Sequence, residues 1–145
     1  MTECLDASVV VKWFRDDEPK TKEAQGLYNR ISDLKSLFVA SEWLVLEVVR
    51  AFVKAGMRKS CIEEHIQVLD QLSTLGAIKL IPVTNTIPLA RELEIELGLH
   101  AADAVHLATA ISTKSAIFWT EDEHLHKNKV KDYAKGHNLE IQKLK

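Results

Sequence analysis

Short apolar runs alternate along the chain with longer segments whose apolar residues recur at helical spacing. The runs are near-continuous in apolar residues, which is typical of strands buried on both faces. We expect strands at residues 1–7, 37–40, 78–82, 116–120 and 139–144, and helices at 8–14, 20–34, 41–54, 60–76, 84–98 and 101–113. This alternation predicts right-handed crossovers and an α/β fold with a mostly parallel sheet covered by helices on both faces.

Four acidic residues interrupt segments that otherwise look like core. Asp6 and Asp122 end the first and fourth strands, whereas Glu47 and Asp103 lie in apolar helical segments. Charged groups rarely occupy such positions unless they are paired or bind a metal. Ligands of parallel α/β sheets bind beyond the carboxyl ends of the strands, where Asp6 and Asp122 lie. If the fold brings the four acids together, their repulsion requires shared protons or a divalent cation, and oxygen ligands favour Mg²⁺ or Mn²⁺.

Each acid also has a purely structural explanation. Asp6 can cap the first helix, Asp122 can cap a short last one, and Asp103 can complement the dipole of its own helix. Glu47 can pair with Arg50 one turn further on. These explanations do not say why all four acids interrupt apolar segments, so we favour a joint function.

Histidines and hydroxyl residues near the acids are weaker candidates. His100 and His106 are six residues apart, so on a helix they face different directions. We interpret both as packing or partner-contact residues. Three further histidines lie in polar surroundings and are expected to face water: His124, His126 and His137. Ser8 and Thr120 lie beside acids and can hydrogen-bond a carboxylate, although capping is an equal alternative and Ser8 is our expected cap of the first helix.

Composition narrows the class of protein. A chain of 145 residues is long enough for one domain with a real core, and we expect a single domain over residues 1–145. The net charge of −2 excludes a strongly basic surface, so any contact with nucleic acid must be local and metal-assisted. Neither a membrane-spanning segment nor a signal peptide is expected, and two cysteines without a CxxC motif favour the cytoplasm.

Four segments together resemble the PIN-domain family, and within it the small VapC ribonuclease toxins. They are LDASVVVKW at 5–13, LEV at 46–48, ADAVHLA at 102–108 and TED at 120–122. Each is a weak match alone, but their order and spacing extend over nearly the whole chain. The opening segment and the segment around Asp103 are the strongest.

The resemblance implies a three-layer α/β/α fold that binds Mg²⁺ or Mn²⁺ and cleaves RNA. It also implies a homodimer or higher homo-oligomer and a cognate antitoxin that inserts into the site. Carried over by position, the metal-binding acids are Asp6, Glu47, Asp103 and Asp122, supported by the hydroxyls of Ser8 and Thr120.

Two assignments within this set have competitors. Glu42 competes with Glu47, which we prefer for its apolar setting, and Glu121 competes with Asp122, which we prefer for its spacing from Thr120. A non-catalytic module that binds RNA or protein is the alternative function, because function belongs to the site and not to the fold. A phosphotransfer receiver or aspartyl phosphatase is a third, but the further acids that either requires are missing. An apolar helical face around Val48, Val49 and Phe52 is our expected dimer surface.

Overall fold

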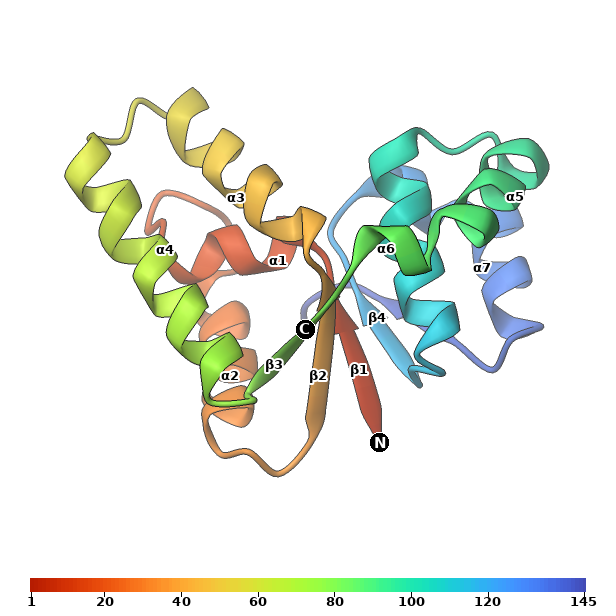
Figure 1. Ribbon diagram of the computed structural model, residues 1–145, viewed down its shortest axis with the longest axis horizontal. Helices are drawn as coiled ribbons and strands as arrows, with labels where there is room; N and C mark the ends of the chain where they lie inside the picture. The colour runs from red at the N-terminus through yellow and green to blue at the C-terminus, as the bar shows by residue number, and fades with distance from the viewer.

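A five-stranded, entirely parallel sheet forms the centre of the computed structural model, which describes residues 1–145 (Figure 1). The strands are β1 (Thr2–Leu5), β2 (Leu37–Ser41), β3 (Ile78–Ile81), β4 (Ile117–Trp119) and β5 (Glu140–Gln142). Their order is β3-β2-β1-β4-β5, and every neighbouring pair is parallel. All five expected strands are therefore present, and the chain changes direction across the sheet between β1 and β4.

Helices cover both faces of this sheet. They are α1 (Ala7–Val10), α2 (Thr21–Ser32), α3 (Trp43–Lys54), α4 (Lys59–Thr74), α5 (Ile87–Leu97), α6 (Ala101–Ser112) and α7 (Asn128–Lys135), with short 3₁₀ helices η1 (Val11–Trp13), η2 (Val83–Asn85) and η3 (Glu123–His126). In Figure 1, α1 to α4 lie on one side of the strands and α5 to α7 on the other. The expected three-layer α/β/α architecture is confirmed.

Two separate apolar cores hold the layers together. Alternate residues of β1 and β2 enter different cores: Leu5 and Phe38 pack under α1 to α4, whereas Cys4 and Val39 pack under α5 to α7. Burial on both faces explains why these strands are continuous apolar runs instead of alternating ones.

Two expectations need correction, and one helix was not expected. Asp6, not Ser8, caps α1, because its carboxylate follows the strand directly and accepts the Ala7 N–H. Helix α7 lies where the sequence shows mainly lysines, and only Val130 and Ala134 along it are buried.

The expected dimer surface is also wrong. Val48 and Phe52 are fully buried in the core between α3 and its neighbours, and the exposed apolar side chains of α3 are instead Trp43, Leu46 and Val53. None of the helices combines the length and apolar character needed to cross a membrane.

Candidate metal centre

Asp6 lies where β1 ends, and several donors hold its carboxylate in place. Its Oδ1 accepts the Ala7 N–H at 2.8 Å, while Oδ2 accepts the hydroxyls of Ser8 at 2.9 Å and Thr120 at 2.6 Å. The residue is 5% exposed. A buried carboxylate with three donors keeps one orientation, so capping α1 and presenting oxygens at the sheet edge are compatible roles.

The two hydroxyl residues connect the ends of adjacent strands. Ser8 Oγ accepts the Glu121 N–H at 3.0 Å, and Thr120 Oγ1 accepts the Asp122 N–H at 3.1 Å. The turn after β4 is thereby fastened to the turn after β1. These strands flank the point where the sheet order reverses, which is where parallel α/β sheets bind ligands.

Glu47 reaches the same edge from α3 and meets His106 from α6. The Glu47 carboxylate contacts His106 Nε2, which lies 3.6 Å from Asp6 Oδ1. Ligand atoms of Asp6, Glu47 and His106 all lie within 4.8 Å of one another. Burial alone lowers the pKa of His106, but the hydrogen bond with Glu47 and the nearby negative charges outweigh it and raise the pKa.

His106 is the site residue that sequence reasoning missed. The expectation of a packing role is incomplete: the imidazole is fully buried, yet it faces the acids. The spacing between His100 and His106 gives no indication of this placement. The useful signal is that Asp103 and His106 are three residues apart, which places them on one side of a helix.

A second cluster joins the first turn of α6 to the turn after β4. Ligand atoms of Asp103, Asp122 and His124 lie within 4.8 Å of one another. Asp122 accepts hydrogen bonds from the backbone N–H and Nδ1 of His124, at 2.9 Å and 3.0 Å. The side chain of His124 is 60% exposed, so it faces water as expected while also binding an acid.

The two acids of this cluster shift each other's protonation. Burial, followed by repulsion from Asp122 and Asp6, raises the pKa of Asp103 to about 7. Burial also disfavours the charge of Asp122, but hydrogen bonds from His124 and Asp103 prevail and lower its pKa. Opposite pKa shifts of this kind show that the two carboxylates repel each other when both are ionised. A bound dication would remove this repulsion.

All four predicted acids therefore lie at one edge of the sheet. Asp6 belongs to the cluster with Glu47, Asp103 belongs to the cluster with Asp122, and the charge of Asp6 acts on Asp103. A donor set dominated by carboxylate oxygens suits hard divalent cations. The residues present thus fit Mg²⁺ or Mn²⁺.

Comparison with known proteins assigns the chain to a family. The family profile described as PIN domain matches residues 4–131. The chain belongs to the PIN-domain family. Curated proteins give no match to the sequence.

Solved structures resemble this PIN domain over nearly its full length. VapBC2 from Rickettsia felis, bound to a DNA fragment from its promoter, is 14% identical, covers 100% of both chains and has a TM-score of 0.67. FitAcB from Neisseria gonorrhoeae is 17% identical over 96% of this chain and 95% of that one, with a TM-score of 0.61. VapBC-1 from nontypeable Haemophilus influenzae is 16% identical over 99% and 98%, with a TM-score of 0.59. The expected likeness to VapC proteins is confirmed in the fold.

The two competing acids of this PIN domain have structural partners elsewhere. Glu42 Oε1 accepts the Val83 N–H at 2.9 Å. Glu121 accepts the Leu144 N–H at 2.9 Å and lies 3.4 Å from Lys20 Nζ. Both bonds fasten loops to the domain, and neither acid belongs to the two clusters.

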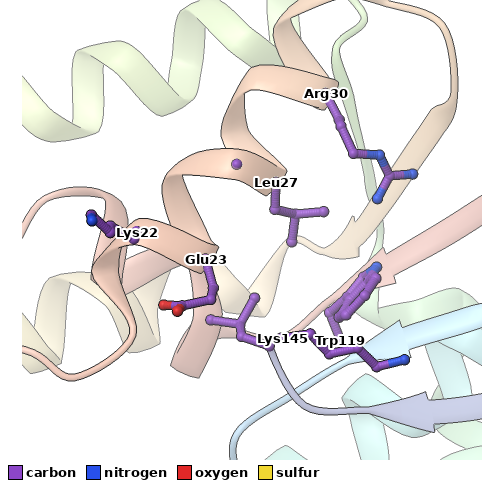
Figure 2. A pocket seen from close by; sticks show the side chains of 8 residues that line it. Lys22, Glu23, Leu27, Arg30, Trp119 and Lys145 are labelled. Carbon is purple, nitrogen blue, oxygen red and sulfur yellow. The ribbon is translucent and has the colours of Figure 1, made fainter.

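One hollow of the PIN domain is lined by none of the four acids. Figure 2 shows this cavity of about 450 Å³, lined by Lys22, Glu23, Gly26, Leu27, Arg30, Trp119, Leu144 and Lys145. Two of the lining residues, Arg30 and Trp119, hold the fully buried carboxylate of Glu3. This cavity is therefore separate from the candidate metal centre, which is identified by its charged residues.

The raised pKa of Asp103 predicts a pH dependence of stability. Between the unfolded pKa near 3.8 and the folded value of about 7, the folded protein binds the extra proton, so stability falls as pH rises through this window. We expect Asp103→Asn to raise the melting temperature of the metal-free protein above pH 7 and to have little effect near pH 4. Thermal unfolding with a chelator at both pH values measures this. A lower melting temperature of the variant at high pH would contradict the electrostatic picture.

Proposed function

We propose that this PIN domain is a metal-dependent endoribonuclease and the toxin of a VapBC-type toxin–antitoxin pair, acting as one domain in the cytoplasm. The observation that carries the proposal is the convergence of four acids from distant segments at the switch point of the sheet. Family membership supports it, because the acids lie on the segments by which the chain resembles the family.

Asp6, Glu47, Asp103 and Asp122 would hold Mg²⁺ or Mn²⁺, directly or through water. The bound cation supplies activation of water and neutralisation of charge during phosphodiester hydrolysis. The protein supplies preorganisation: hydroxyls of Ser8 and Thr120 fix Asp6 before any cation arrives.

Asp103 has a further role in loading the site. In the metal-free protein its carboxyl shares protons with Asp122 and is about half protonated near pH 7. Binding of a cation favours the ionised form, so the proton on Asp103 is released when the site is filled. Affinity for the cation should accordingly rise as pH increases through 7.

Partners follow from the chemistry and from the structural likeness. In this proposal the substrate is RNA. Because the protein as a whole has a net charge of −2, the RNA backbone must be guided by positively charged side chains close to the site. Lys127 immediately precedes α7, and lysines 129, 131 and 135 lie along it, next to the segment that carries Asp122. VapBC2 and VapBC-1 share the fold, and we propose an antitoxin partner and a homodimer for this chain by analogy.

The decisive experiment separates binding from catalysis. Purified protein is titrated with Mn²⁺ by calorimetry and incubated with single-stranded RNA in Mg²⁺, in Mn²⁺ or with a chelator. We expect cation binding, cleavage with either cation and none with the chelator. Binding of RNA without uptake of cation or cleavage would favour the non-catalytic module.

Two glutamates of one helix end provide a matched comparison. We expect Glu47→Gln to lower cleavage at least about 100-fold, because the variant loses a charged cation ligand. Glu42→Gln removes the same charge but only a loop contact, and should cleave within about threefold of the wild type. Initial rates on one RNA at saturating Mn²⁺ measure both. The reverse ranking would show that Glu42 is the site acid.

A further inference from the structure

His106 is more buried than any of the four acids of the candidate metal centre, and their proposed role as metal ligands does not explain its imidazole. It lies one turn after Asp103 on α6, in the layer opposite to the helix that carries Glu47. Nε2 faces the carboxylates of Glu47 and Asp6, whereas Nδ1 has no hydrogen-bond partner. The two ring nitrogens are therefore in very different surroundings.

These surroundings decide which nitrogen carries the hydrogen when the His106 ring is neutral. An ionised carboxylate only accepts hydrogen bonds, so the contact with Glu47 requires a hydrogen on Nε2. A hydrogen on Nδ1 of the neutral ring would be a buried donor with no acceptor, which is costly. A nitrogen that carries a hydrogen has no lone pair to offer a metal.

We propose that His106 is a positioning residue whose Nε2–H holds the Glu47 carboxylate beside Asp6 without itself binding the cation. This inference rests on the proposed metal-dependent function. His106 is the sole side chain that hydrogen-bonds Glu47, whose own side chain is 32% exposed and otherwise free to turn into solvent. The imidazole thus fastens a ligand of α3 to the helix that supplies Asp103.

The energetic consequence concerns cation affinity. Without His106, the Glu47 side chain must lose its rotational freedom each time the site is filled. Groups that hydrogen-bond metal ligands typically change metal affinity 10–100-fold when they are removed. Loss of His106 should therefore weaken the binding of Mn²⁺ by about 10–100-fold.

Three substitutions test whether His106 acts as a hydrogen-bond donor at Nε2 or only fills space. The amide nitrogen of glutamine is as many bonds from Cβ as Nε2 of histidine, so His106→Gln keeps the donor. In His106→Asn the amide reaches only the Nδ1 position, and in His106→Leu the donor is lost while apolar volume remains. Mn²⁺ affinity is measured by calorimetry, and folding of each variant by circular dichroism.

We expect His106→Gln to bind Mn²⁺ within about threefold of the wild type, and the other two variants about 10–100-fold more weakly. Equal affinity in all folded variants would overturn the proposal, as would equal weakening in all three. Long-range ¹H–¹⁵N spectra of the metal-free wild type give an independent reading. A hydrogen on Nε2 of His106 supports the proposal, and a bare Nε2 overturns it even if a variant fails to fold.

The outcomes also distinguish this inference from the proposed function. If the wild type takes up no Mn²⁺, the metal-dependent nuclease fails. If the wild type takes up Mn²⁺ and His106→Leu does so equally well, only the role of His106 fails.

Discussion

Replacing Asp6 by asparagine is expected to abolish metal-dependent RNA cleavage while leaving the protein folded. Asp6 is the most buried of the four acids and influences both clusters, through its proximity to His106 and its charge effect on Asp103. Asparagine removes the negative charge but retains nearly the same shape. We expect cleavage to fall about 1000-fold or more, corresponding to about 4 kcal/mol of lost transition-state stabilisation.

The fold should survive this substitution because asparagine is also a good helix cap. Its side-chain oxygen can still accept the Ala7 N–H. The hydroxyls of Ser8 and Thr120 lose a charged acceptor, so we expect a stability change on the order of 1 kcal/mol, in either direction because a buried charge is also removed.

Asp70→Asn is the matched control, since it removes one exposed carboxylate from α4. Cleavage rates with Mn²⁺, calorimetric titration with Mn²⁺ and thermal unfolding are compared for the two variants and the wild type. Wild-type cleavage by Asp6→Asn would remove this residue from the proposed mechanism. A similar loss in Asp70→Asn would show that the effect follows net charge instead.

The sequence was most informative about the sheet. Continuous apolar runs identify strands that are buried on both faces, and Gly56, Gly76 and Gly98 mark helix ends where the backbone has φ of 77°, 79° and 66°. Helix α7 escaped notice because its lysines hide a short pattern with just Val130 and Ala134 facing the core. Eight residues with two buried positions carry too little periodicity to be recognised.

Only part of the site can be located from the order of strands and helices in the sequence. Asp6 and Asp122 follow strands, so their common edge follows from topology. The meeting of Glu47 with His106 depends on how α3 and α6 cross the same edge from opposite layers, which no local pattern encodes. The cap of α1 shows the same limit: Ser8 and Asp6 are equivalent as cap residue types, and the end of β1 decides between them.

Convergence from both layers makes the site sensitive to the packing of α3. Phe52 lies on this helix and is fully buried. Its ring centre is 5.8 Å from that of Phe14. We expect Phe52→Ala to lower the free energy of unfolding by about 3–5 kcal/mol, because the variant loses buried apolar surface and leaves a cavity. Urea denaturation followed by circular dichroism measures the change.

Val53→Ala, the neighbouring position on the same helix, tests whether burial is the cause. Val53 is 51% exposed, so its truncation should change the free energy of unfolding by no more than about 0.5 kcal/mol. If residues 48–52 formed a dimer surface, Phe52→Ala would instead shift the oligomeric state in light scattering and barely change the stability of the subunit. Because Val48 and Phe52 are both fully buried within one chain, we expect the large loss of stability to be independent of protein concentration.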